Sequence, residues 1–325
     1  MKIVAVTRVL NEDDILEAFA RHHAAHVDHH IFLDNGSSDR SLAILRSLHD
    51  IGFPITLLRS RAVIFNETGY NAFLLRYAVQ QFEADWVLFL DCDEFLDLRD
   101  SEASLREHLR LVPPEIMALK LELANYHQSP SDSPDEMLVP RRLTQRDRTG
   151  TGVHKVVVRG SLSGQPAVVS AGNHEVLLNG EPVPSRVEAQ IRLAHYFRRS
   201  AWQVITKTLT GRLKVLAAGQ QELQHNTASH YVDFFETMRD APERLLADEN
   251  FMRGPVQGLD LVTDPIAYNG GMLTFTQRSD DRLKAIRNLM HLAEALAAQH
   301  GRLMDGNEAI RAQVDRWNAT VERFF

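Results

Sequence analysis

Two hydrophobic patterns alternate along the first hundred residues. Short apolar or β-branched runs predict strands, and these runs are Lys2–Val9, His29–Leu33, Ile55–Leu58 and Trp86–Leu90. Between them, apolar residues recur on one helical face, as at Leu42, Leu45 and Leu48. Every position of Trp86–Leu90 is apolar, which indicates burial on both faces, as in a parallel sheet. The alternation predicts an α/β core of the kind that binds nucleotides.

The middle and the end of the chain follow other patterns. Further strands with few helices between them are predicted over Ile116–Ala124, Glu136–Leu143, Val153–Arg159, Ala167–Ser170, His174–Leu178 and Gln190–Tyr196. Proline and serine crowd Gln128–Asp135, which predicts a loop. Ser200 is placed to cap a helix that ends near Leu216. We therefore expect a β-rich region after the α/β part, and a helical extension after that.

Polar residues follow the first two predicted strands. We expect Asn11 to cap a helix whose first turn holds Glu12, Asp13 and Asp14, because acids favour the positive end of the helix dipole. Residues Asp34–Asp39 contain a glycine and predict a turn that leads into the next helix.

Two carboxylates directly follow the most apolar strand. Side chains alternate along an extended chain, so we expect Asp91 and Asp93 to project to one side, with Cys92 packed on the other. Ligands of open parallel sheets bind beyond the carboxyl ends of the strands. Two carboxylates at that place repel each other unless a cation lies between them, and oxygen ligands suit Mg²⁺ or Mn²⁺. The pair therefore predicts a metal–diphosphate site.

Composition narrows the function classes. The chain has 36 Lys and Arg against 43 Asp and Glu, a net charge of −7, which argues against nucleic-acid binding. A single cysteine excludes an intrachain disulfide and a cysteine-based zinc site. No apolar run approaches the ~20 residues of a membrane span, and Met1–Leu10 lacks the apolar core of a signal peptide. We expect a cytoplasmic protein.

These motifs, in this order and at these spacings, resemble those of GT-A glycosyltransferases, in the branch between family-2-like and family-92-like enzymes. The segments that carry the resemblance are Thr7–Glu12, Val27–Asp39, Asp85–Phe95, Gly152–Arg159, Asn173–Glu175 and His195–Ser200. The resemblance implies a Rossmann-like, mostly parallel sheet flanked by helices. It also implies a core over residues 1–215, with a nucleotide-sugar half (1–100) and a β-rich acceptor-side half (101–215). Residues 216–325 would form a C-terminal helical extension.

The resemblance also implies roles for single residues. Thr7, Arg8, Asn11, Glu12 and Asp34 would line the base and ribose of a nucleotide sugar. Asn35 stands where family-2 enzymes often carry a second aspartate, which leaves the choice of nucleotide open. Asp91 and Asp93 would form the DxD motif that holds Mn²⁺ or Mg²⁺ and the diphosphate, with His195 as third metal ligand and Lys155, Lys207 and Arg212 near the diphosphate.

An acceptor hydroxyl needs a base if the anomeric carbon inverts, as the resemblance favours. The candidates are Glu175, Asp132, Asp135 and His174, with Glu175 preferred because it follows Asn173-His174 at the start of a predicted strand. The implied reaction is metal-dependent transfer of a hexose from a nucleoside diphosphate, with UDP favoured by the family, to a hydroxyl of a glycan or lipid-linked acceptor.

Two other functions stay open at this point. A sugar nucleotidyltransferase also binds nucleotide and metal, but it carries a glycine-rich loop after the first strand, and Arg8–Glu12 has no glycine. A non-catalytic nucleotide- or glycan-binding module is the other alternative, against which the intact Asp91 and Asp93 speak. The C-terminal helices would cover the acceptor groove, pair two subunits, or rest on the inner face of a membrane.

Overall fold

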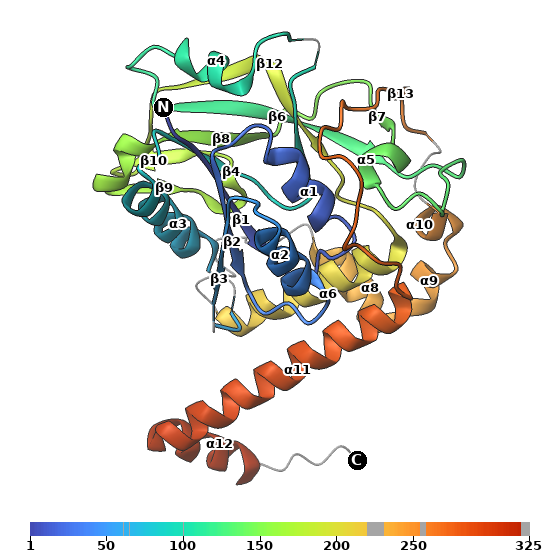
Figure 1. Ribbon diagram of the computed structural model, residues 1–325. Helices are drawn as coiled ribbons and strands as arrows, with labels where there is room; N and C mark the ends of the chain where they lie inside the picture. The colour runs from blue at the N-terminus through green and yellow to red at the C-terminus, as the bar shows by residue number, and fades with distance from the viewer. Residues whose placement is uncertain (61, 65, 100, 220–230, 254–257, 320–325) are drawn as a thin grey trace.

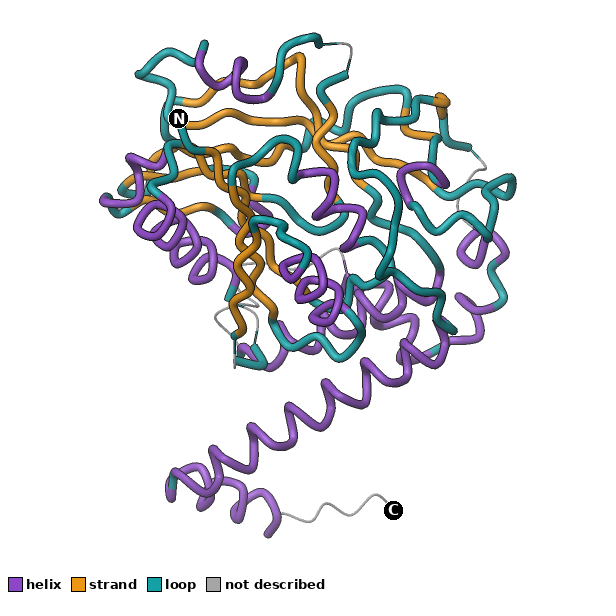
Figure 2. Tube along the Cα trace, in the orientation of Figure 1, coloured by secondary structure: helices purple, strands orange, loops and turns teal. Residues whose placement is uncertain are grey.

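The computed structural model describes residues 1–319 except 61, 65, 100, 220–230 and 254–257. Strands occupy the centre of the molecule, and helices lie around them (Figures 1 and 2). In this described part of the chain, the main sheet has ten strands. Eight of them follow the order β13-β7-β6-β8-β4-β1-β2-β3, and the other two branch from this path, since β12 pairs with β6 and β5 pairs with β12.

One half of the sheet is parallel. Its strands, in spatial order, are β4 (Trp86–Phe89), β1 (Ile3–Val9), β2 (His29–Asp34) and β3 (Ile55–Arg59). Helices α1 (Leu16–His23) and α2 (Ser41–Asp50) cover one face of these strands, and α3 (Glu67–Phe82) covers the other. The four carboxyl ends therefore meet at one edge of the sheet, between the helical layers.

The other half of the sheet is mixed. Its strands are β5 (Glu94–Asp97), β6 (Ala118–His127), β7 (Gln145–Asp147), β8 (His154–Arg159), β12 (Ser185–His195) and β13 (Leu261–Thr263). Strand β8 pairs antiparallel with both β4 and β6, and so joins the two halves. A small separate sheet contains β9 (Ala167–Val169), β10 (Val176–Leu178) and β11 (Glu181–Pro182).

In the described residues, the remaining helices are α4 (Leu105–Arg110), α5 (Val139–Arg142), α6 (Ala201–Ala218), α8 (Val232–Asp240), α9 (Pro242–Leu246), α10 (Glu249–Arg253), α11 (Asp281–Gly306) and α12 (Glu308–Ala319), with 3₁₀ turns at η1 (Gly160–Gly164) and η2 (Ala171–Asn173). Helices α6 and α11 pack together below the carboxyl edge of the parallel strands (Figure 1). Asn288 of α11 accepts a hydrogen bond of 2.9 Å from Ser38, so the helical extension contacts the turn after β2.

The predicted α/β class, with a sheet flanked by helices, is confirmed. The Ser200 cap is also confirmed, since its Oγ accepts from Gln203 N at 3.1 Å. The strand predicted over Glu136–Leu143 is wrong, because this segment holds the short helix α5. Pro140 lies in its first turn, where a missing N–H costs no intrahelical hydrogen bond.

The helix cap predicted at Asn11 is wrong as well. Helix α1 begins at Leu16, without a capping side chain. Asn11 has a φ of 58°, and its Oδ1 accepts a hydrogen bond of 2.8 Å from Ser38 N. Asn11 therefore joins the loop after β1 to the turn after β2, at the edge where a ligand of this sheet would bind.

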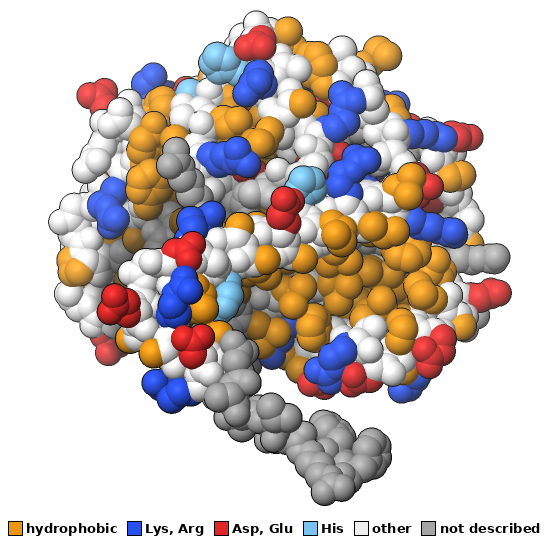
Figure 3. All heavy atoms as spheres, turned by 90° about the horizontal axis from the view of Figure 1, so that it is seen from below, with side chains coloured by type: hydrophobic (Ala, Val, Ile, Leu, Met, Phe, Trp, Pro, Cys, Tyr) orange, Lys and Arg blue, Asp and Glu red, His pale blue; other side chains and the backbone are white. Residues whose placement is uncertain are grey.

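Apolar side chains gather on the underside of the molecule (Figure 3). Helix α11 exposes Leu283, Ile286 and Met290 at spacings of three and four residues, and α9 exposes Leu246. The helical extension therefore presents apolar residues to solvent. Within the described ranges, each helix is too short or too polar to cross a bilayer.

Candidate functional site

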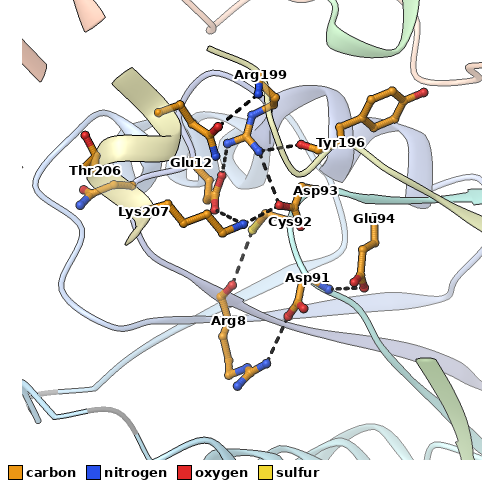
Figure 4. Close-up of polar contacts among 12 residues, drawn as sticks. Arg8, Glu12, Asp91, Cys92, Asp93, Glu94, Tyr196, Arg199, Thr206 and Lys207 are labelled. Atoms are coloured by element: carbon orange, nitrogen blue, oxygen red, sulfur yellow. Dashed lines mark hydrogen bonds and ion pairs between the residues drawn. The ribbon is translucent and has the colours of Figure 1, made fainter. Parts of the chain in front are cut away.

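The acidic segment after β4 is a tight turn, and it does not continue as an extended strand. Glu94 N donates a hydrogen bond of 3.0 Å to Asp91 O, and β5 begins at Glu94. The expectation that Asp91 and Asp93 project to one side of an extended chain is therefore wrong. The reversal directs the two carboxylates to different cations (Figure 4).

Asp91 lies between two cations. Its Oδ1 is 3.1 Å from Arg8 Nη2, and its Oδ2 is 2.6 Å from Lys155 Nζ. Burial alone raises the pKa of Asp91, but the charges of Lys155 and Arg8 outweigh burial and hold it well below its usual range. Lys155 Nζ also lies 2.8 Å from Glu94 Oε1. Asp91 is thus ionised at neutral pH and bound to protein cations.

Asp93 is the more buried acid, and it contacts a second set of cations. Its Oδ2 lies 2.5 Å from Lys207 Nζ and 3.6 Å from Arg199 Nη1, and its Oδ1 lies 3.9 Å from His195 Nε2. Burial raises the pKa of Asp93, whereas Lys207, His195 and Arg199 together lower it below its usual range. Asp93 therefore carries its charge in a buried position.

Arg199 is a buried cation that stabilises the position of Asp93. Its side chain is 1% exposed, and its guanidinium contacts Glu12, Asp14 (2.6 Å) and the carbonyl oxygen of Tyr196 (3.1 Å). A planar guanidinium matches several acceptors in fixed directions. Arg199 thus ties the loop after β1 to the segment between β12 and α6, and it orients Asp93 between them.

Three side chains form a group that could hold a metal ion. Oxygens of Asp93 and Glu94 and a ring nitrogen of His195 all lie within 4.8 Å of one another. Glu94 and His195 come together because they are register partners of the antiparallel β5–β12 pair. His195 Nδ1 lies 2.9 Å from Asn125 Oδ1. When Nδ1 carries the proton, it donates to Asn125, and the lone pair of Nε2 faces the carboxylates.

The side chains of this group suit a divalent cation once Glu94 has lost its proton. Burial lowers the pKa of His195 to about 4, so the imidazole is neutral at pH 7. Burial also raises the pKa of Glu94 to about 8, despite the nearby Lys155, and Glu94 Oε1 makes no well-formed hydrogen bond. A cation beside Glu94 would favour the ionised carboxylate. Two carboxylates and a neutral imidazole match the ligands that Mn²⁺ accepts.

Asp93 and His195, two of the three predicted metal ligands, thus lie together, with Glu94 beside them. Asp91 lies in the same turn, but its oxygens face Arg8 and Lys155. Direct metal ligation by Asp91 stays a prediction.

The residues predicted to line the nucleotide occupy the carboxyl edge, with one exception. Asp34 accepts hydrogen bonds from the backbone N–H groups of Gly36 (3.1 Å) and Ser37 (2.9 Å), so its carboxylate shapes the turn after β2. Thr7 is the exception, because its Oγ1 contacts His30 Nε2 at 2.8 Å within the core. The structure therefore does not bring Thr7 to the acidic group.

Glu175, the preferred base, lies away from the acidic group. Its carboxylate pairs with Lys120 Nζ at 3.2 Å. Lys155 is the register partner of Leu121, so Lys120 and Lys155 project from opposite faces of the β6–β8 pair. The ion pair therefore holds Glu175 on the face that Lys155 does not use.

The other candidate bases lie in the loop after β6. Asp132 accepts a hydrogen bond of 2.7 Å from Ser129 N, and burial raises its pKa. Asp135 is 84% exposed and pairs with Arg278 at 2.7 Å. Pro134 of this loop lines a cavity of about 330 Å³, together with residues around the acidic group such as Glu12, Arg199 and Lys207.

Arg212, expected near the diphosphate, lies on α6 beyond Lys207. Among the described residues, no hydrogen bond or ion pair joins Arg212 to an acid of this group.

Three residues of the site, Arg199, Glu94 and Asn125, were not predicted from the sequence. Glu94 could have been predicted as a site residue, because it directly follows Asp93. Its contact with His195 could not, because it depends on the pairing of two strands that lie far apart in the sequence.

The chain is similar to several solved structures. Among solved structures, a mannosyltransferase from Pyrobaculum calidifontis in complex with GDP-Man and Mn²⁺ is 16% identical, with a TM-score of 0.31, over 40% of this chain and 36% of that chain. S. aureus TarS 1–349 is 11% identical, with a TM-score of 0.39, over 91% of this chain and 81% of that chain.

A third similar structure is glucosyl-3-phosphoglycerate synthase from Mycobacterium tuberculosis in complex with Mn²⁺, UDP and phosphoglyceric acid. It is 16% identical, with a TM-score of 0.35, over 61% of this chain and 72% of that chain. This chain thus covers only 36% of the mannosyltransferase, but 81% of TarS 1–349 and 72% of the synthase.

No curated protein sequence matches the chain. A family model does: the model of glycosyltransferase family 92 matches residues 15–231, more than half of the 325 residues, and its range contains the acidic turn, His195 and Lys207. The protein is a glycosyltransferase, and the chain belongs to glycosyltransferase family 92.

Proposed function

We propose that the protein transfers a hexose from a nucleoside-diphosphate sugar, with UDP as the favoured carrier, to a hydroxyl of a glycan or lipid-linked acceptor, with inversion and with a divalent metal ion. One observation supports this most directly. Asp93, Glu94 and His195 converge at the carboxyl edge of the parallel strands, and Lys155 and Lys207 point their amino groups at the same place.

The chemistry of the donor explains this combination of charges. Departure of a nucleoside diphosphate leaves negative charge that cations must stabilise as the bond breaks. Asp93, Glu94 and His195 would hold Mn²⁺ or Mg²⁺, and a bound divalent ion supplies positive charge to the diphosphate. Lys155 and Lys207, which pair with acids at the site, would donate further charge-assisted hydrogen bonds to it.

The acceptor would enter from the cavity of about 330 Å³ beside Glu12 and Lys207. Asp132 is better placed than Glu175 to serve as base, because its loop borders this cavity and burial raises the pKa of Asp132. A carboxyl with a raised pKa accepts a proton from a hydroxyl more readily in the transition state.

Screening a panel of sugar nucleotides for release of nucleoside diphosphate, with and without Mn²⁺, tests the proposed function. We expect release from one or two donors only, and only with the metal. Pyrophosphate release from UTP and a sugar phosphate would instead indicate a nucleotidyltransferase. Nucleotide binding that ignores the metal, without turnover, would indicate a non-catalytic module.

His195→Ala should weaken Mn²⁺ binding at least tenfold, since even the partners of metal ligands change affinity ten- to a hundredfold. Titration calorimetry with Mn²⁺ alone measures this. His49→Ala, at an exposed histidine, is the matched control and should bind as the wild type. An unchanged titration for His195→Ala would leave His195 as a hydrogen-bonded residue of the core.

Other sequence-based expectations stay predictions. These are the boundary of the core at residue 215, the cytoplasmic location, and contact of the C-terminal helices with a membrane surface or a second subunit. The apolar residues of α11 that solvent reaches, Leu283, Ile286 and Met290, are where such a contact would form.

A further inference from the structure

A second cavity, of about 1100 Å³, lies beside the acidic group. It is bounded by the turn after β2, the segment after β3, and helices α6 and α11. Its polar lining includes Asn11, Asn35, Arg59, Lys214 and Asn288. Leu10, Asn11, Thr210 and Asn288 line both this cavity and the smaller one that contains Glu12 and Lys207. The two cavities therefore adjoin.

Asn35, expected to contact the nucleotide, is already occupied by protein partners. Its Nδ2 donates to the carbonyl oxygen of Ala62 at 3.0 Å and to Tyr70 Oη at 3.2 Å. Its Oδ1 accepts from Lys214 Nζ at 2.7 Å. The amide thus has both donor hydrogens and one acceptor position in use, so little of it is left for a ligand.

Lys214 is the buried cation of this cavity. It is 3% exposed, and its amino group donates to Asn35 O at 2.6 Å and to Asn35 Oδ1 at 2.7 Å. An ammonium has three hydrogens to donate. Among the described residues, no carboxylate forms an ion pair with Lys214, and no acceptor is found for its third hydrogen. Burial lowers the pKa of Lys214 to about 8, which reflects this incomplete solvation.

Helix α6 connects this lysine to the acidic group. Lys207, Thr210 and Lys214 are spaced at i, i+3 and i+7, and so lie on one face of the helix. Seven residues advance the helix by about 10 Å. Lys207 contacts Asp93 at one end of this face, and Lys214 lines the larger cavity at the other. This spacing suits a ligand with a diphosphate at one end and a base at the other.

We propose that the larger cavity holds the nucleoside of the donor, and that Lys214 selects the nucleotide by donating a hydrogen bond to a carbonyl oxygen of its base. This inference rests on the proposed function. Uracil and guanine offer such an oxygen, whereas adenine offers none.

Binding of nucleoside diphosphates in the presence of Mn²⁺, measured by calorimetry on the full chain, tests this inference. Wild-type protein should bind UDP or GDP more tightly than ADP. Lys214→Met should lose ten- to a hundredfold in affinity for the preferred nucleotide, the range of a charge-assisted hydrogen bond, and should no longer discriminate against ADP. Lys2→Met, at the exposed amino end of the chain, is the matched control.

Inorganic pyrophosphate separates selection of the base from general attraction. Its affinity should be the same in wild type and Lys214→Met, and an equal loss for pyrophosphate and UDP would overturn the role in base selection. Lys214→Gln, which keeps a donor for Asn35, gives the same test if the Met variant does not fold. Normal UDP affinity in the variants would refute this inference alone, whereas a wild type that binds no nucleotide would refute the proposed function itself.

Discussion

Asp93→Asn is expected to lower the rate of glycosyl transfer by on the order of a thousandfold or more and to leave the fold intact. The carboxylate belongs to the group that could hold a metal ion, and it contacts Lys207 at 2.5 Å. Metal-ion stabilisation of a leaving group contributes several kcal/mol, and each 1.36 kcal/mol changes the rate tenfold. Asparagine keeps the shape of the side chain. It removes the negative charge that attracts the metal ion and the ammonium group of Lys207.

The fold should survive this change because the neighbouring cations keep other partners. Arg199 retains Glu12 and Asp14, and Lys207 is partly exposed to solvent. Release of nucleoside diphosphate measures the rate, and circular dichroism checks the fold. Asp50→Asn, at an exposed position of α2, is the matched control. Near-normal transfer by Asp93→Asn would contradict the assignment of the metal group.

The position of the candidate site could be predicted from the sequence, because it follows from the order of the strands and helices. A fully apolar strand followed by acids places those acids at the carboxyl edge of a parallel sheet. Asp93, Lys207 and His195 do meet there. These three residues lie far apart in the sequence. Their proximity could therefore be predicted only from the fold that the resemblance implies.

The arrangement within the site was not predictable, because it depends on contacts between distant segments. The turn at Asp91–Glu94 lets β5 pair with β12, which sets Glu94 opposite His195. Local pattern gave no sign of this pairing. Asn11 failed as a helix cap for a similar reason, since Ser38, 27 residues away, provides its partner.

The role proposed for Lys214 has a partial basis in the sequence pattern. The spacing of Lys207 and Lys214 puts both on one face of a helix that was itself predicted. A lysine buried on the core side of an amphipathic helix requires an acceptor. The sequence could not show that Asn35 would provide two, because that contact spans 179 residues.

Arg199→Met is expected to lower the free energy of unfolding at pH 7 by about 3–5 kcal/mol, the usual cost of removing one partner of a buried ion pair. The change leaves Glu12 and Asp14 without the cation that they share. Urea unfolding followed by circular dichroism measures the loss. Arg198→Met is the matched control, since Arg198 stacks on Phe197 at 5.6 Å, and it should cost less than about 1 kcal/mol.

The pH dependence separates lost charge from lost packing. Although burial raises the pKa of Asp14, Arg199 outweighs it and holds that pKa below its usual range. Asp14 therefore stabilises the wild type above its unfolded pKa of about 3.9, and this contribution is lost as pH falls through the native pKa. Without Arg199, Lys284 and Arg142 still oppose the effect of burial, but we expect the pKa of Asp14 to be higher than in the wild type, so that protonation relieves the variant as pH falls from 7 towards 5. The difference in unfolding free energy should narrow over that range. An unchanged difference would mean that Arg199 acts through the packing of its aliphatic stem.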